Sequence, residues 1–288
     1  MMLTESSFKT LLKIPAFIGI AIVAVIFSVL FYFSLPSLKA FGLAFYTSGT
    51  WNPNEAEFGL LTFLVGTLIT SIVALLLSIP FSLSIALFIN YAKAPDFIKK
   101  WLQIFIDTLA GIPSIIYGFW GLFVLAPLIR IIQIKLNLIP YGVGLLTASI
   151  ILTIMIIPLS SSLISDLLKL LPKDLEEAAV SLGATQFETI RYIMLPMISK
   201  GMFSAFFMAF GRAMSETMAV TMVIGNFNQF PSSIFSPSNT LSSVIANEFA
   251  EAVEPIYISS LVQLGLILFF ITLITGIITK HIAKQHAY

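Results

Sequence analysis

Six apolar stretches constrain this chain more than any other feature, because about 20 apolar residues in a helix cross the ~30 Å hydrocarbon core of a bilayer. They cover residues 14–38, 59–91, 104–129, 143–165, 201–225 and 255–279. Only 10% of the 288 residues are charged, against roughly a quarter in an average soluble domain. The sequence therefore predicts an all-α membrane protein with six transmembrane helices.

Helix-breaking residues modify two of these stretches. The second is 33 residues long, which is about 50 Å as a straight helix, and Pro80 offers a kink. The third is rich in Gly and Pro, which membrane helices accept where neighbours satisfy the freed backbone, and this favours a helix inside a bundle. Asp107, near its start, is interpreted as a cap of the helix that contains residues 111–114, with a place at an inner gate as the alternative.

Composition excludes several classes of function. Lys plus Arg number 15 and Asp plus Glu 14, so no basic field for nucleic acid exists. The chain has no cysteine, which excludes disulfides and thiolate sites. His281 and His286 lie in the last eight residues and are expected to be solvated, so no metal site and no cofactor are predicted. No phosphate-binding loop of the G-x-x-x-x-G-K-[ST] type is present, so ATP must be hydrolysed by another subunit.

Positive charge predicts the orientation in the membrane, since cytoplasmic loops carry an excess of Lys and Arg. With the N-terminus inside, the inner segments hold eleven such residues: Lys9, Lys13, Lys93, Lys99, Lys100, Lys169, Lys173, Arg191, Lys200, Lys280 and Lys284. The outer segments hold three: Lys39, Arg130 and Lys135. We therefore expect both termini to be cytoplasmic.

The polar segment 171–201 lies between the fourth and fifth apolar stretches, on the cytoplasmic side. Asp174 with Glu177, and Thr185 with Glu188, have the spacing of capping boxes. Gly183 falls where the first helix should end in a left-handed residue. The pattern predicts a helix, a glycine turn and a second helix that Pro196 ends or bends. An ordinary charged loop with capped helices is the alternative.

The outer segment 226–255 contains three Glu and no Lys or Arg. Its first half is rich in Pro, Ser and Asn and is typical of a loop. From Thr240 onward, apolar residues recur at helical spacing and predict an interfacial or re-entrant helix. This segment is expected to be a connector on the rim of the bundle, with a docking surface for an external partner as the alternative.

The polar segment also carries a fixed pattern, Glu177-Ala178-Ala179, Gly183, Ile193 and Leu195-Pro196. It resembles the E-A-A-x3-G-x9-I-x-L-P loop of ABC importer permeases at every defined position. The resemblance implies a type I, MetI-like permease fold and a coupling helix that docks on a cytoplasmic ATPase. It implies that the residues coupled to the ATPase are Glu177, Ala178, Ala179, Gly183, Thr185 and Glu188.

Three further stretches, 107–121, 211–226 and 241–252, resemble the PstC-type permease of phosphate-specific ABC importers. The resemblance extends over most of the chain from Gly66 onward, and Ser215 departs from the small residue, usually Gly, expected there. We expect residues 1–58 to form an N-terminal transmembrane helix and external loop, and 59–288 to form the importer transmembrane domain with a cytoplasmic coupling loop over 166–200.

Arg212 and Glu216 are charges near the middle of the predicted fifth span, where each costs at least ~2.5 kcal/mol. Four residues apart, they are expected to share one helix face. One interpretation is a structural ion pair that fixes helix packing. The other is a substrate path in which Arg212 binds a phosphate oxyanion. Glu216 would then orient Arg212, keep the empty path near neutral, or accept a hydrogen bond from monoprotonated phosphate.

Together these features predict a permease subunit of an ATP-driven phosphate importer, not an enzyme, in a prokaryotic plasma (inner) membrane. Its expected partners are a second, related permease subunit, a cytoplasmic ATPase dimer, an extracytoplasmic phosphate-binding protein and the lipid bilayer, with no nucleic acid. A permease for another oxyanion, such as sulfate, molybdate or phosphonate, is the alternative. A stand-alone secondary transporter is a weaker one, because it would not need the coupling loop.

Overall fold

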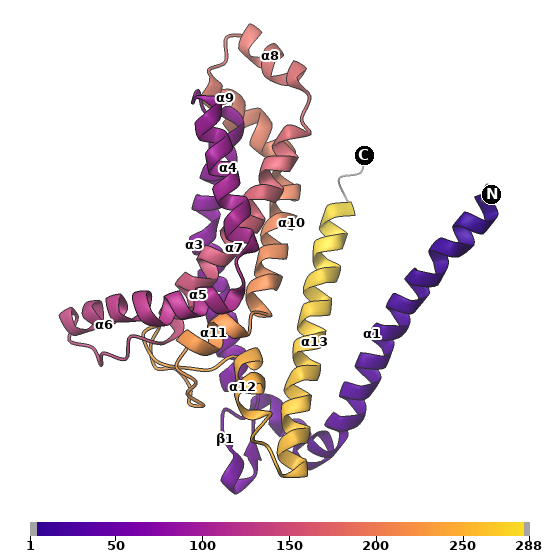
Figure 1. Cartoon of the computed structure of the whole chain (residues 1–288), viewed down its shortest axis with the longest axis vertical. Helices are drawn as coiled ribbons and strands as arrows, with labels where there is room; N and C mark the ends of the chain where they lie inside the picture. Colours follow the sequence, from indigo (N-terminus) through magenta and orange to yellow (C-terminus); the bar gives the residue numbers. More distant parts are fainter. Residues whose placement is uncertain (1–4, 285–288) are drawn as a thin grey trace.

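Helices make up nearly all of the computed structural model, which describes residues 5–284, and side chains over 13–282 (Figure 1). In chain order the elements are α1 (Glu5–Phe41), α2 (Ala44–Thr47), β1 (Trp51–Asn52), the 3-10 turn η1 (Pro53–Glu55), β2 (Glu57–Phe58), α3 (Leu61–Tyr91), α4 (Asp96–Gly111), α5 (Ser114–Trp120), the π-helical turn η2 (Gly121–Leu125), α6 (Ala126–Lys135), α7 (Leu145–Lys169), α8 (Lys173–Ser181), α9 (Gln186–Thr189), the π-helical turn η3 (Ile190–Met194), α10 (Leu195–Met214), α11 (Met218–Val223), α12 (Leu241–Glu248) and α13 (Pro255–Lys284). The two short strands form an antiparallel hairpin that pairs Trp51 with Phe58.

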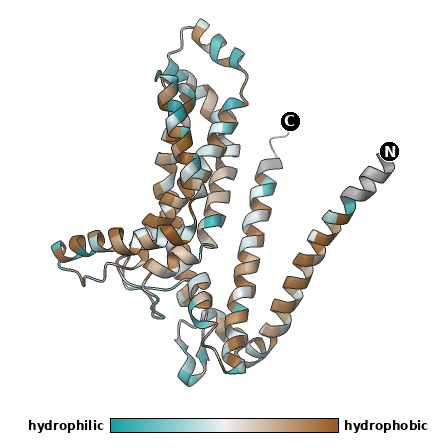
Figure 2. Cartoon of the chain, viewed as in Figure 1, coloured by the Kyte–Doolittle hydropathy of each residue, from teal (hydrophilic) through white to brown (hydrophobic). Residues whose placement is uncertain are grey.

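Within the described residues, six helical runs are long and apolar enough to cross a membrane, which confirms the predicted number: Lys13–Phe41, Leu61–Tyr91, Ser114–Lys135, Leu145–Lys169, Gln186–Met214 and Pro255–Ile282. Apolar residues continue along most of their length (Figure 2). The first, second, fourth and sixth runs agree with the prediction to within a few residues. The third and fifth do not.

The centre of the helix bundle is α7. In its span, 67% of an 18-residue apolar stretch is buried, whereas none of the corresponding stretch of α1 is buried. Small polar side chains join it to α3: the hydroxyls of Ser82 and Ser160 lie 2.6 Å apart, and Asn90 Nδ2 donates to Ser165 Oγ at 2.8 Å. Such small residues allow two helix backbones to approach closely in a membrane. The sequence places them where α3 and α7 pack side by side.

The third span differs from the prediction because the chain breaks at Ile112 and Pro113. Proline cannot continue a helix that needs its amide, and it disfavours helical backbone in the residue before it. The break is bridged by Tyr117, whose hydroxyl donates to the carbonyl of Leu109 at 2.8 Å. From Ser114 onward, α5 and α6 run across the direction of α3, α7 and α10 (Figure 1). One face of the segment formed by α5, η2 and α6 is buried against α7 and α11, and the other face is exposed. The predicted helix inside the bundle is therefore enclosed on one side only.

The fifth span also differs, at both ends. Helix starts at Gln186 and continues through the π-helical turn into α10, so Pro196 does not end it. A proline ring clashes with the carbonyl four residues earlier, here that of Tyr192, and this residue lies in the wider π-helical turn. The helix then stops at Met214, where the Ser215 hydroxyl donates to the carbonyl of Gly211 at 3.0 Å. The predicted run from 201 to 225 is therefore wrong.

The outer part of the bundle is completed by α11, a loop and α12 instead of a continuous fifth helix. The predicted helix from Thr240 is confirmed, and Thr240 and Ser243 form its capping box. The start of α12 is buried against α3, where Leu241 N donates to Thr67 Oγ1 at 3.0 Å. The helix ends at Glu248, so Val253 is exposed in the connector to α13.

Gly66 of α3 makes this buried seat of α12 possible, because a Cβ there would overlap the carbonyl oxygen of Asn239. We predict that Gly66→Ala lowers the free energy of unfolding by about 1–3 kcal/mol, the usual cost of overpacking. The measurement is thermal unfolding of the purified protein in detergent. Gly19→Ala in α1 is the matched control, since nothing lies within 4 Å of a Cβ at Gly19. Equal melting temperatures for Gly66→Ala and the unsubstituted protein would contradict the prediction.

Candidate functional site

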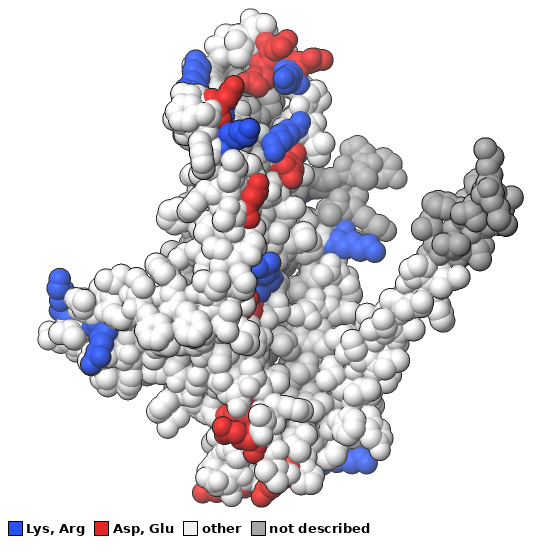
Figure 3. Space-filling model, in the orientation of Figure 1, with Lys and Arg blue, Asp and Glu red and all other residues white. Residues whose placement is uncertain are grey.

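Charged side chains gather at one end of the molecule, around α8, while its middle is largely uncharged (Figure 3). The start of α1 and the end of α13 lie toward this same end (Figure 1). The segment from α8 to α9, which we call the polar hairpin (residues 173–189), projects beyond the other helices there. This is the helix, turn and helix that the sequence predicts.

The first helix of the hairpin starts one residue before the predicted cap. Pro172 occupies the N-cap of α8, and no side chain caps this helix. Asp174 lies inside the first turn, so the predicted capping box of Asp174 with Glu177 is wrong. Pro172 determines where α8 starts, because the φ angle that its ring fixes is one that a residue directly before a helix can adopt. Asp174 still favours the helix, since a carboxylate in the first turn interacts well with the helix dipole.

The turn between the two helices is confirmed in detail. Gly183 has φ +92°, a conformation that favours glycine. The Ala184 amide donates to the Ala179 carbonyl at 3.1 Å and the Gly183 amide to the Val180 carbonyl at 2.9 Å. These two bonds form a Schellman motif, which satisfies the last carbonyls of α8. A defined turn of this kind gives the hairpin one shape.

The second capping box is also confirmed. Glu188 N donates to Thr185 Oγ1 at 3.3 Å, and Thr185 N donates to Glu188 Oε2 at 2.8 Å. The side chain of Gln186 fastens this helix to the end of α3 by donating to the carbonyl of Tyr91 at 2.7 Å. The hairpin is therefore held to the bundle at its second helix, while α8 stands further out.

The exposed surface of the hairpin contains most of the predicted coupling residues. Glu177 and Ala178 are exposed, but Ala179 is only 5% exposed, so the expected two-alanine patch is reduced to one residue. Three apolar side chains that the motif does not include are exposed at the tip: Val180, Leu182 and Phe187. Leu182 is 90% exposed. Leu182 lies directly before the glycine turn, and this position is the signal that could have identified it.

Arg212 and Glu216 do not share a helix face, because α10 ends between them. Arg212 lies in the last turn of α10, and Glu216 follows the break, where its Oε1 accepts from the amide of Ala219 at 3.3 Å. Among the described residues Arg212 forms no ion pair with Glu216 or with any other carboxylate. The predicted common face is therefore wrong, and a structural ion pair is not what holds these two residues.

Helix ends explain where the two charges lie. A cation is stabilised at the C-terminal end of a helix, as Arg212 is in α10, and an anion at the N-terminal end, as Glu216 is before α11. Arg212 is exposed and Glu216 is partly buried. A Cβ at Gly211 would lie 3.4 Å from Thr275 Oγ1, so the last turn of α10 lies alongside α13.

A groove between α10 and α13 contains Arg212. Its volume is about 450 Å³, and it is lined by Ser204, Phe207, Met208, Gly211, Arg212, Ser215, Thr272, Thr275, Gly276, Thr279 and Lys280. Its two cations lie on different helices, Arg212 on α10 and Lys280 near the end of α13. The groove combines Arg212 with hydroxyl, small and apolar side chains, and its walls are mostly apolar.

Asp107 does not cap the helix that follows it. It lies inside α4, four residues before its end at Gly111, and accepts from Gln103 Nε2 at 2.9 Å. The cap interpretation is wrong because α4 and α5 are separate helices, and Pro113 occupies the N-cap of α5. In residues 5–284 no group of three or more His, Asp and Glu side chains could hold a metal ion. His286 lies outside the described residues.

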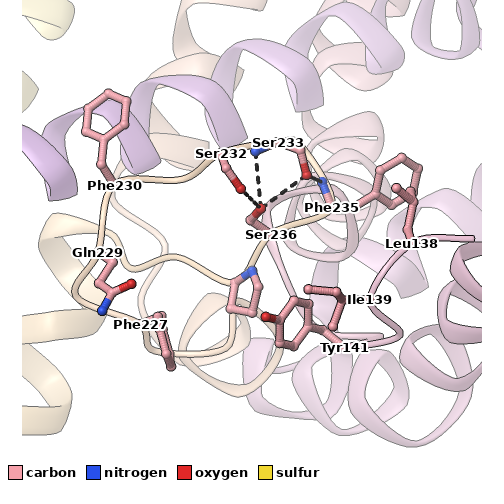
Figure 4. Close-up of a pocket in the computed structure, with 11 residues that line it drawn as sticks. Leu138, Ile139, Tyr141, Phe227, Gln229, Phe230, Ser232, Ser233, Phe235 and Ser236 are labelled. Atoms are coloured by element: carbon pink, nitrogen blue, oxygen red, sulfur yellow. Dashed lines mark hydrogen bonds between the residues drawn. The ribbon is translucent and has the colours of Figure 1, made fainter.

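A pocket of about 340 Å³ lies between the α6–α7 connection and the loop before α12 (Figure 4). The hydroxyls of Ser232 and Ser233 lie 3.0 and 3.1 Å from that of Ser236, and these serines gather on one side of the pocket. Tyr141 and Phe230 are exposed at its rim. This pocket belongs to the outer segment that the sequence identifies as connector or docking surface.

Comparison with known proteins gives consistent results. Residues 78–286 match the family described as binding-protein-dependent transport system inner membrane component. The chain is 40% identical to the phosphate transport system permease protein PstC of Mesorhizobium japonicum, with 98% of this chain and 91% of that protein covered. It is 39% identical to PstC of Haemophilus influenzae, with 96% and 92% covered.

Solved structures show the same fold. An inward-facing form of the MetNI methionine ABC transporter has a TM-score of 0.55 at 16% identity, with 77% of this chain and 93% of that chain covered. An amino acid ABC transporter crystallised with histidines has a TM-score of 0.54 at 18% identity, with 78% and 92% covered. At such identities the likeness concerns the fold alone.

The second capping box generates a prediction about the polar hairpin. We expect Thr185→Ala to destabilise the start of α9 by about 1 kcal/mol, the usual cost of losing an N-cap. Hydrogen exchange measured by mass spectrometry should therefore be about fivefold faster at the amide of Glu188. Ser181→Ala is the control, since that hydroxyl donates only to the Glu177 carbonyl within α8. Unchanged exchange in Thr185→Ala would show that the cap does not stabilise the hairpin.

Proposed function

Since the chain belongs to the family of binding-protein-dependent transport system inner membrane components, we propose that it is the permease subunit of an ATP-driven importer of inorganic phosphate. The observation that carries this proposal is the 40% identity to a phosphate permease over 98% of the chain. The chain has the predicted six-span, MetI-like fold. It is a transport subunit and not an enzyme.

The polar hairpin is the site where a separate ATPase acts on this subunit. Its tip offers Glu177 together with the apolar side chains of Val180 and Leu182, all of them exposed. Burial of such apolar side chains in a groove of a partner provides binding energy, and a carboxylate at the edge provides orientation. Closure of an ATPase dimer around ATP moves the hairpin and the helices attached to it. A second permease subunit completes the translocation path.

Arg212 is the residue that we propose to bind phosphate in this path. Its guanidinium is exposed at the end of α10, has no carboxylate partner among the described residues, and can offer two donors to an oxyanion. Glu216 lies after the same break and is proposed to accept from the hydroxyl of monoprotonated phosphate. Fully ionised sulfate has no such donor, which is the basis for discrimination. Asp107, exposed in the last part of α4, is a lesser candidate for the inner gate.

Phosphate uptake by the complete importer in proteoliposomes tests this function. We expect Arg212→Ala to lower uptake more than about tenfold, since a charge-assisted hydrogen bond contributes roughly 1.5–3 kcal/mol. Arg212→Lys keeps the charge but loses the paired donors, so intermediate uptake is expected. Arg191→Ala, at a cation on the hairpin side of the same helix, is the control for loss of charge, with ATPase binding checked separately.

Two results would overturn the proposal. Uptake that continues when the ATPase is inactivated would indicate a secondary transporter. Sulfate, molybdate or phosphonate uptake in place of phosphate uptake would indicate a permease for another oxyanion. A Glu216→Gln variant with unchanged uptake and unchanged discrimination against sulfate would remove Glu216 from the path while leaving the role of Arg212 intact.

We also propose that the subunit lies in a prokaryotic plasma (inner) membrane with both termini and the hairpin in the cytoplasm, and that an extracytoplasmic phosphate-binding protein docks on the opposite end. The ratio of eleven inner to three outer cations and the common side of α1, α13 and α8 support this orientation. The pocket of Figure 4 lies on the proposed docking face.

Because the chain has no cysteine, single cysteines report the orientation directly. Val253 and Leu182 are 86% and 90% exposed, at opposite ends of the molecule. In spheroplasts, a membrane-impermeant maleimide should label Val253→Cys, and should label Leu182→Cys only after permeabilisation. The reverse pattern would invert the proposed topology.

A further inference from the structure

The carboxylate of Glu248 is held by three segments that are far apart in the sequence. Its Oε2 accepts from Trp51 Nε1 at 2.7 Å and from the Tyr257 hydroxyl at 2.6 Å, and its Oε1 accepts from Asn228 Nδ2 at 2.6 Å. These donors belong to β1, α13 and the loop after α11, while Glu248 ends α12. Hydrogen bonds to a charged group are about twice as strong as neutral ones. We call Glu248 and its three donors the outer clamp.

The outer clamp continues into a directional chain of side chains. Asn228 donates to Glu248, so its Oδ1 is free to accept from Asn239 Nδ2, at 2.9 Å. Asn239 Oδ1 in turn accepts from the Thr240 amide at 3.1 Å and from the hydroxyl of Ser243. The negative charge on Glu248 therefore sets the direction of each amide back to the start of α12.

The start of α12 reaches the break that follows Arg212 and the end of α10. Ser242, in the first turn of α12, donates its hydroxyl to the backbone carbonyl of Glu216 at 2.8 Å. That carbonyl belongs to the irregular residues between α10 and α11, four residues after Arg212. One short helix thus joins the outer clamp at its last residue to the proposed phosphate site at its first turn.

We propose that Glu248 is a positioning residue for transport, which fixes the outer segments as one unit and, through α12 and Ser242, fixes the break beside Arg212. This inference rests on the proposed phosphate uptake. The outer clamp lies on the face proposed for the binding protein. A change there reaches Arg212 through α12, because Glu248 and Ser242 are on the same two-turn helix.

Glu248→Gln tests the proposal because the chain of amides cannot adapt to it. The new amide group would face Asn228 Nδ2, and turning Asn228 around would place its amide against that of Asn239. We expect the maximal rate of binding-protein-dependent phosphate uptake in proteoliposomes to fall about tenfold, in line with lost bonds to a charged group. Glu251→Gln and Glu254→Gln are matched controls, at exposed carboxylates with no side-chain hydrogen bond among the described residues.

A double substitution distinguishes positioning from a general need for charge or stability. In Glu248→Gln with Asn228→Asp, the carboxylate moves from position 248 to position 228, the next member of the hydrogen-bonded series. Trp51 and Tyr257 then donate to the Gln oxygen, and the Gln amide and Asn239 both donate to the Asp carboxylate. Uptake should recover to near the unsubstituted rate. Failure of the double variant to exceed Glu248→Gln would overturn the proposal, as would unchanged uptake in Glu248→Gln itself.

A spin label at Gln229→Cys, an exposed position beside Asn228 in a chain without cysteine, reports the outer clamp without any phosphate. The label should be more mobile in Glu248→Gln and regain its restricted motion in the double variant. Ser242→Ala removes the bond to Glu216 and a 3.3 Å contact with Thr240 Oγ1, but none of the bonds to Glu248, so it should lower uptake and leave the label unchanged. A looser loop with full uptake would overturn the transport role. If the spin label behaves as expected in all variants but the importer transports no phosphate, the proposed function is refuted and the outer clamp is not.

Discussion

The structure depends on one constraint, that backbone amides and carbonyls inside a membrane must be paired within the protein. The segment 215–240, which is irregular except for α11, follows the fifth span, and it is tolerated because its loop pairs with the first turn of α7. The amides of Leu145 and Leu146 donate to the carbonyls of Ser236 and Ile234 at 3.2 and 2.8 Å. No side chain caps α7, so these loop carbonyls take that role. The amides at the start of the most buried helix, α7, and the carbonyls of this loop therefore satisfy each other's hydrogen bonds.

The same constraint bears on the two charges at the end of the fifth span, Arg212 and Glu216. A continuous fifth helix would carry Arg212 and Glu216 on one face, where each would be the natural partner of the other. The break separates them and gives each a helix end that favours its charge. The cost of placing ions in the membrane is thereby lowered without an ion pair. Arg212 keeps its guanidinium donors free of carboxylates among the described residues, which is what binding of an oxyanion requires.

Local chemistry was predictable from the sequence, and tertiary pairing was not. Thr185 with Glu188, Gly183 and Thr240 have side chains or conformations that determine structure within three or four residues, and all three predictions are confirmed. Pro172 is the N-cap of α8, so the helix starts two residues earlier than a cap at Asp174 would have placed it. The end of α10 at Met214 could not be predicted from the sequence, because the contacts around it come from α7 and α12. Glu248 was only one of three outer acids in the sequence, since its donors come from three different elements and one of them, Trp51, is 197 residues away.

Continuous helix from Gln186 to Met214 changes how force could reach the proposed phosphate site. A run of 29 residues is about 43 Å long and carries no loop between the polar hairpin and Arg212. Had the helix started at residue 201, a flexible joint would have separated the two. The end of this rod at the polar hairpin is fastened to α3 through Gln186, and the break at its other end is held by Ser242 of α12. In the proposed mechanism, a displacement of the hairpin would move Arg212 relative to the carbonyl of Glu216 that Ser242 of α12 holds.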